Sequence, residues 1–208
     1  MNSTDSLIDQ LAQDGAAPRP ASLPRFVAPL ALAMAICAIG IALVLEAPFI
    51  GMAINGPGPM LVKWGFSIAL LLLSGFALWF IGRPGKATGA TMATLAVPFI
   101  LLAALLGADL AIGQRAFPGE TWQRCLAAMA VMSPIAFGGA ILAARWLAPT
   151  NLHRAGLVAG MFGGAAAMTA YSPHCPEHGM AYVAVFYCLP ILTMAALGWL
   201  LGPRLLRW

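Results

Sequence analysis

Six long apolar runs, separated by short breaks rich in proline and glycine, constrain this chain more than any other feature. A hydrocarbon core about 30 Å thick needs roughly 20 apolar residues per helix, and each run has about that length. None of the runs alternates with the period of two that a half-buried strand requires. The sequence therefore predicts an all-α polytopic membrane protein with six transmembrane helices, over Phe26–Leu45, Leu61–Ile81, Thr91–Ile112, Arg124–Trp146, Leu152–Tyr171 and Met180–Gly202.

The composition supports the same class. Only 9% of the residues are charged and 61% are hydrophobic, whereas ordinary soluble domains carry about 25% charged residues. Breaks such as NGPGPM at 55–60 cannot continue a helix. Pro98, Pro134 and Pro190 fall inside predicted spans, where neighbouring helices can compensate for a lost backbone hydrogen bond. Dense small residues, as in GMFGGAAAM at 160–168, favour close helix packing.

The distribution of basic residues predicts the orientation. With six spans both termini share one side, and that side would carry eight of the 11 Lys and Arg residues. Cytoplasmic segments are enriched in Lys and Arg, so we expect both termini in the cytoplasm and residues 171–180 on the outer face, which is periplasmic if the cell is Gram-negative. Residues 1–25 would form a cytoplasmic segment and residues 26–208 the transmembrane domain. The basic residues do not cluster, so the net charge of +4 predicts no direct nucleic-acid binding.

The chain lacks the usual marks of a transporter or an enzyme. Ion-coupled carriers bury ionisable groups inside the membrane, but none is expected near the middle of a span here, because Lys63 is placed in the first turn of its helix. The sequence has no Cys-x-x-Cys pair, phosphate loop or nucleophile elbow, which predicts no enzyme activity and no required cofactor. Most interfacial aromatic residues are expected to form a belt: Tyr171, Tyr182, Tyr187, Trp122, Trp146, Trp199 and Trp208.

The stretch YSPHCPEHGM, between the fifth and sixth predicted spans, concentrates groups that bind soft metals. His174, Cys175 and His178 lie there, and thiolate and imidazole groups suit zinc, copper(I) and softer ions. Cys125 is expected at a similar depth on the same outer side. Three interpretations remain open: a structural disulfide between Cys125 and Cys175, a redox-sensing thiol pair, and a transient soft-metal site formed by Cys125, His174 and Cys175, with or without His178.

The surroundings of the four cysteines differ. Arg124 precedes Cys125, and a neighbouring guanidinium would lower the pKa of that thiol and increase its reactivity. Cys37 and Cys188 are flanked by apolar residues inside predicted spans. We expect these two to be small packing residues.

The N-terminal segment STDSLIDQLAQDG carries a short amphipathic pattern. Leu7, Ile8 and Leu11 recur at helical spacing, whereas Asp5 and Asp9 take another face. About ten residues are too few for a stable helix in water, so a frayed tail is one interpretation. The other is an apolar stripe with acidic flanks that folds when it docks on a basic cytoplasmic partner.

Several of these motifs together resemble the NrsF family. They are the opening DSLIDQLAQD followed by APRP, the W-x-x-C of Trp122 and Cys125, the HCPE of 174–177 and the closing LGPRLLRW. The similarity runs along almost the whole chain. It implies a six-helix inner-membrane anti-sigma factor, which holds an extracytoplasmic-function sigma factor, sigma-F, inactive until metal or oxidative stress. Two cysteines take part in that response.

Carried over to this chain, the resemblance implies that Cys125 and Cys175 are the sensor pair. Retention of the sigma factor would fall to the N-terminal segment around Leu7, Ile8 and Leu11. The alternatives from other classes are a membrane thiol oxidoreductase, a metal-handling permease, and a scaffold whose cysteines only form a disulfide.

Overall fold

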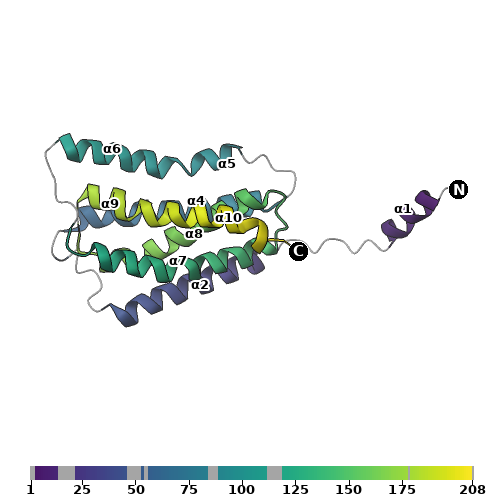
Figure 1. The fold of residues 1–208 in the computed structure, drawn as a ribbon, viewed down its shortest axis with the longest axis horizontal. Helices are drawn as coiled ribbons and strands as arrows, with labels where there is room; N and C mark the ends of the chain where they lie inside the picture. Colours follow the sequence, from purple (N-terminus) through teal and green to yellow (C-terminus); the bar gives the residue numbers. More distant parts are fainter. Residues whose placement is uncertain are drawn as a thin grey trace.

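The computed structural model describes residues 3–13, 22–45, 53, 56–83, 89–111, 119–177 and 179–207. Within these ranges the chain is helical and contains no strand (Figure 1), which confirms the all-α prediction for this part. The elements are α1 (Ser3–Gln13), α2 (Leu23–Val44), α4 (Pro57–Ile81), α5 (Gly89–Thr94), α6 (Val97–Ala111), α7 (Trp122–Arg145), α8 (Leu152–Tyr171), the 3-10 turn η1 (Ser172–His174), α9 (Met180–Phe186) and α10 (Cys188–Leu205).

Five helical segments are long and apolar enough to cross a membrane. They correspond to five of the six predicted spans, with ends that differ by a few residues. The remaining predicted span is α8, a helix of 20 residues whose composition falls short of the other five. The five segments are Leu23–Val44, Pro57–Ile81, Gly89–Ala111, Trp122–Arg145 and Met180–Leu205.

The position of α8 explains its composition. This helix packs most extensively against α10, then against α7 and α4, and 15 of its 20 residues are buried. A helix enclosed by other helices does not need the large apolar side chains that solvate well in lipid. It needs small ones, because without a hydrophobic driving force between helices, association depends on close packing.

Glycines make the contact between α8 and α10 unusually close. Gly156 and Gly160 of α8 face Gly198 and Gly202 of α10. A Cβ atom added to Gly156 would overlap the carbonyl oxygen of Gly198, and one added to Gly160 would overlap that of Met194. The backbones therefore touch directly, as the small-residue segments predict.

Pro98 and Pro190, two of the prolines inside predicted spans, coincide with helix breaks. Pro98 is the second residue of α6, just after the turn that separates α5 from α6. Pro190 lies in the first turn of α10, and a turn at Tyr187 separates α9 from α10. By contrast, Pro134 is accommodated within the continuous helix α7.

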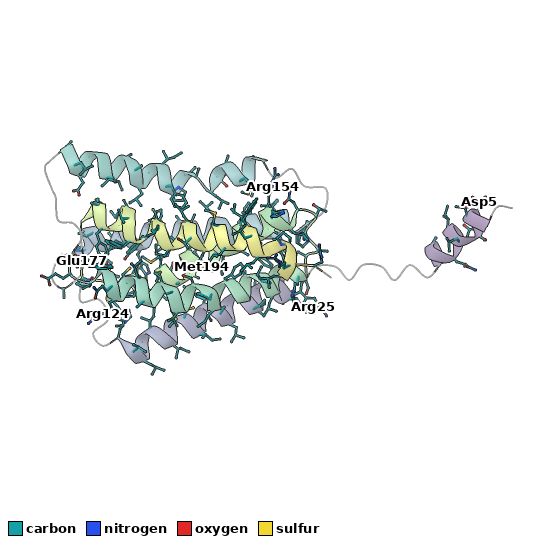
Figure 2. All side chains as sticks on the ribbon, in the orientation of Figure 1. Asp5, Arg25, Arg124, Arg154, Glu177 and Met194 are labelled. Carbon is teal, nitrogen blue, oxygen red and sulfur yellow. The ribbon has the colours of Figure 1, made fainter. Side chains whose placement is uncertain are left out.

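The two ends of the bundle differ in chemistry. Figure 2 shows Arg25 and Arg154 at the end beyond which α1 lies, and Arg124 and Glu177 at the opposite end. We call the second the cysteine end, because Cys125 and Cys175 lie next to Arg124 and Glu177 in sequence. We call the first the arginine end, defined by Arg25, Arg83, Arg145, Arg154, Arg204 and Arg207.

Candidate functional site: a buried cysteine cluster

The fold brings together the two cysteines that the sequence analysis paired. Cys125 lies in the first turn of α7, and Cys175 follows η1. Their residues are 0% and 1% exposed, and the two thiols are close enough to interact electrostatically. Both are free thiols. The cluster therefore holds two sulfur atoms from different elements, both shielded from water and not joined to each other.

Three tyrosines line the cluster. Tyr171, Tyr182 and Tyr187 are all 0% exposed. The hydroxyl of Tyr182 hydrogen-bonds the thiol of Cys125, and that of Tyr187 hydrogen-bonds the thiol of Cys175. Ser172 adds a further hydroxyl, which donates to the Tyr187 oxygen at 3.3 Å. The expectation that these three tyrosines belong to an interfacial belt is wrong, because the helices close over them.

Lys63 is the cation of the cluster, and sequence reasoning missed it. Helix α4 begins at Pro57, so Lys63 lies in the second turn rather than the first, and it is 2% exposed. Its Nζ donates to the carbonyl oxygen of Cys175 at 2.8 Å and to that of Glu177 at 2.6 Å. It also interacts electrostatically with both thiols. The usable signal was a lysine inside an apolar run, which requires a buried partner.

Arg124 does not take the place that the sequence analysis gave it. Consecutive residues on a helix point about 100° apart, so Arg124 and Cys125 face different directions. The structure buries Cys125 and leaves Arg124 exposed. The cation acting on the Cys125 thiol is Lys63.

Glu177 ties the segment after Cys175 to the start of α7. Its Oε1 accepts from the backbone N–H of Glu120 at 2.9 Å and of Thr121 at 3.1 Å, and from the Thr121 hydroxyl at 3.1 Å. Thr121 directly precedes α7, where free N–H groups and the helix dipole favour a negative charge. Gly119, at φ 79°, completes the contact, since a Cβ there would lie 2.6 Å from Glu177 Oε2.

The histidines have a less defined environment. His174 lies in η1, and neither ring nitrogen makes a well-formed hydrogen bond within the described residues. Burial lowers the pKa of His174, partly offset by the Ala170 backbone; the shift favours the neutral imidazole, which is the form that binds metals. His178 lies outside the described residues. In the part of the chain that the structure covers, no group of three or more His, Cys, Asp or Glu residues is arranged to hold a metal ion.

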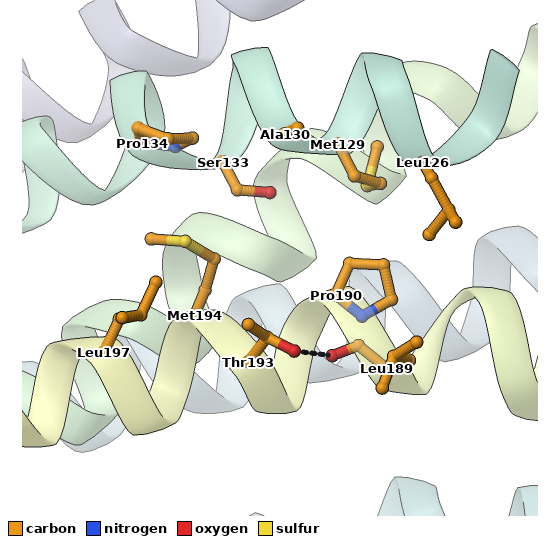
Figure 3. Close-up of a pocket in the computed structure, with 10 residues that line it drawn as sticks. All are labelled: Leu126, Met129, Ala130, Ser133, Pro134, Leu189, Pro190, Thr193, Met194 and Leu197. Atoms are coloured by element: carbon orange, nitrogen blue, oxygen red, sulfur yellow. Dashed lines mark hydrogen bonds between the residues drawn. The ribbon is translucent and has the colours of Figure 1, made fainter. Parts of the chain in front are cut away.

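An apolar pocket of about 410 Å³ lies between α7 and α10. One of its lining residues, Leu126, directly follows Cys125 in the chain. Figure 3 shows Ser133 directed into the space between the two helices; the residue is 1% exposed and its hydroxyl has no partner among the described residues. Pro190 also lines the pocket, and lacking an N–H it frees the carbonyl of Phe186 from the helix. The Cys125 thiol donates to that carbonyl, with a sulfur–oxygen distance of 3.9 Å.

Comparison with known proteins decides the family. Residues 11–208 match the family described as "NrsF: Negative regulator of sigma F". The chain belongs to the NrsF family. It is 34% identical to the "Probable anti-sigma-F factor NrsF" of Azospira oryzae (strain ATCC BAA-33 / DSM 13638 / PS) and 30% identical to the "Anti-sigma-F factor NrsF" of Caulobacter vibrioides (strain NA1000 / CB15N), with 99% of both chains covered in each case. No solved structure matches it. The resemblance deduced from the motifs is confirmed.

The two other cysteines of this NrsF chain do not join the cluster. Cys37 is buried in α2, and its thiol donates to the carbonyl of Met132 on α7 at 3.5 Å. Cys188 is half-buried at the start of α10. Both lie against apolar helix surfaces, in keeping with the packing role expected for them.

The N-terminal segment of this NrsF chain forms the helix α1. Leu7 and Ile8 are 54% and 57% exposed, and Asp5 and Asp9 are exposed as well. The side chain of Leu11 lies outside the described residues. The α1 helix thus exposes both its apolar and its acidic side chains, and the bundle buries neither.

Proposed function

We propose that this NrsF protein is a membrane-embedded anti-sigma factor. It binds an extracytoplasmic-function sigma factor of the sigma-F type on the cytoplasmic side, and it releases that factor when Cys125 and Cys175 respond to a heavy metal or an oxidant. The observation that carries the proposal is that α1 lies beyond one end of the bundle, whereas Arg124 and Glu177, close in sequence to the two buried cysteines, lie at the opposite end. The relatives named as anti-sigma-F factors supply the partner.

The proposed topology has six transmembrane helices in the bacterial inner membrane. At 1.5 Å rise per residue, a helix of 20 residues such as α8 spans about 30 Å, which matches the hydrocarbon core. Its lower hydropathy is explained by enclosure within the bundle. The arginine end then faces the cytoplasm with both termini, because positive residues favour that side, and the cysteine end faces the periplasm.

Helix α1 is the proposed sigma-binding element. An amphipathic helix docks by laying its apolar side chains into a groove, and Leu7, Ile8 and Leu11 would provide them. Asp5 and Asp9 would add charge complementarity to a basic surface of the sigma factor. The partner is thus a protein, and the proposal includes no direct contact with nucleic acid.

Sensing would take one of two forms at the same thiols. In the metal form, the sulfur atoms of Cys125 and Cys175 would bind a soft ion and release their protons as it binds. His174 would have to move to join them as a third ligand, because no group of three such side chains is assembled among the described residues. In the oxidative form, the two thiols would give two electrons and two protons to a peroxide-class oxidant, which becomes water as the S–S bond forms. A tenfold rise in free sigma factor needs only about 1.4 kcal/mol of differential affinity.

Cysteine substitution tests the sensor assignment. We expect Cys125→Ser and Cys175→Ser to abolish induction of sigma-dependent transcription by cadmium or dichromate. The matched control is Cys188→Ser, which removes a thiol outside the cluster and should leave induction intact. Full induction in both cluster variants would remove the sensing role.

Deletion of residues 2–14 tests the docking assignment. We expect the sigma factor to copurify with the full-length membrane protein from detergent and to be absent after the deletion. A sharper variant is Leu7→Asp with Ile8→Asp, which removes two exposed apolar side chains without shortening the chain. Undiminished copurification with both variants would show that the sigma factor binds elsewhere.

A further inference from the structure

We infer that Lys63 and Glu177 act as a clasp that holds residues 175–177 over the two thiols, and so sets how readily Cys125 and Cys175 react. This inference rests on the proposed function for its biological purpose, but the contacts that carry it are independent of any sigma factor. Both are positioning residues, since they act through the segment that bears the thiol rather than on the reagent itself.

The thiols as they stand are closed to reagents. With Cys125 0% and Cys175 1% exposed, neither a hydrated ion nor an oxidant can contact sulfur. Cys125 is part of α7, a helix that packs extensively against α8, whereas residues 175–177 form no helix. Access therefore depends on movement of residues 175–177, and on the contacts that resist it.

Lys63 provides the first of those contacts. Its ammonium donates to two carbonyl oxygens of the segment, those of Cys175 and Glu177, at 2.8 Å and 2.6 Å. A buried ammonium without partners is strongly unfavourable. Moving the segment away would strip Lys63 of both acceptors at once, so the two hydrogen bonds break together and the closed position is held cooperatively.

Glu177 provides the second contact, on the other side of the segment. Its carboxylate accepts three hydrogen bonds from Glu120 and Thr121 at the start of α7, while its backbone carbonyl accepts from Lys63 on α4. One residue thereby joins two helices across the thiol pair. Hydrogen bonds to a charged acceptor are stronger than those between neutral groups, so this contact adds to the closure that Lys63 provides.

The same clasp links the cysteine end to the arginine end. Helices α4 and α7 both run the length of the bundle, and they end beside Arg83 and at Arg145. When residues 175–177 leave their place, the outer turns of both helices lose a shared contact. The change is therefore delivered to the two helices that reach the proposed sigma-binding side.

The test is site-resolved alkylation of the full-length protein with N-ethylmaleimide, quantified by mass spectrometry. We expect Glu177→Ala to accelerate labelling of Cys125 and Cys175 at least about tenfold, equivalent to about 1.4 kcal/mol. Lys63→Met should also accelerate labelling, but by less, because it removes a positive charge that favours the reactive thiolates. Arg124→Gln, which removes an exposed positive charge at the same end, should leave both rates unchanged. Labelling of Cys188, outside the cluster, should be unaffected in every variant.

A gentler variant keeps the inference falsifiable if Lys63→Met does not fold. Glu177→Gln retains the shape and an acceptor oxygen, so it should recover part of the protection that Glu177→Ala loses. Wild-type labelling rates in Glu177→Ala and Lys63→Met would overturn the clasp, as would equal acceleration of Cys188, which indicates general unfolding. If Cys125 and Cys175 are labelled faster but uninduced sigma-dependent transcription stays at the wild-type level, the clasp stands and its link to sigma release fails.

Discussion

Lys63 and Arg83 lie near opposite ends of α4, and the surroundings of their two positive charges differ. At the cysteine end Lys63 is 2% exposed and binds two fixed carbonyl oxygens. At the arginine end Arg83 is half-buried and lies over the ring of Trp79, with 3.9 Å from its guanidinium carbon to the ring centroid. A buried charge has to keep its partners, whereas a charge at the surface can exchange them for water or another molecule.

This difference suits the two ends to different tasks. The cysteine end is a closed set of polar groups in which one displacement breaks several contacts, as a switch requires. At the arginine end most of the cations are exposed, and α1 beyond that end carries exposed acidic and apolar groups. Exposed groups of these kinds are suited to binding a partner protein. Between the two ends, α8 packs on α10, α7 and α4, so a shift at one end cannot be absorbed by loose packing in the middle.

The largest expected effect comes from disturbing the close contact between α8 and α10 in the middle of the bundle. We expect Gly160→Ala to lower the free energy of unfolding by at least about 3 kcal/mol, the upper end of the range for overpacked cores, because the added Cβ overlaps the Met194 carbonyl. The control is Gly138→Ala, where a Cβ meets nothing within 4 Å. Thermal unfolding in detergent should separate the two by several degrees; equal midpoints would show that the α8–α10 contact is not rigid.

A second experiment dissects the cysteine end with two glycines. Gly56 and Gly119 both have positive φ, of 76° and 79°, but only at Gly119 would a Cβ meet another group, the Glu177 carboxylate. We expect both substitutions to cost about 1–3 kcal/mol from backbone strain, and Gly119→Ala to cost about 1 kcal/mol more than Gly56→Ala, because its Cβ would also displace the Glu177 carboxylate. The difference, measured by thermal unfolding, isolates the fit of Glu177 against α7; equal losses would mean that the carboxylate adjusts freely.

The smallest expected effect lies at the arginine end. Replacing Arg83 with Gln removes its contact with Trp79, and interactions of a cation with an aromatic ring are worth about 0.5–1 kcal/mol at exposed sites. We expect a loss within that range by thermal unfolding. Arg25→Gln, whose guanidinium carbon is 5.6 Å from the centre of the Trp146 ring, should cost less. A larger loss for Arg83→Gln than for Gly119→Ala would reverse the comparison between the ends.

The sequence analysis placed the helices well because the hydrophobic pattern is local. It found the five apolar spans and paired Cys125 with Cys175. It placed Lys63 in a first turn because the predicted helix started at Leu61, whereas Pro57 begins the actual helix. It assigned the tyrosines to the interfacial belt because the sequence near a helix end is the same whether a neighbouring element buries the aromatic residue or leaves it exposed to lipid.

Composition and periodicity by themselves determined that the chain is helical, that it is rich in segments able to cross a membrane, and which loop carries thiol and imidazole groups, since each follows from a few consecutive side chains. The motifs were enough to find the family. The tertiary structure alone decided which cation approaches the thiols, which loop carboxylate caps α7, and why α8 needs glycine. The contacts of the cation and of the carboxylate join residues more than 50 positions apart in the chain, and the geometry of all three depends on how the helices rotate and close around α8.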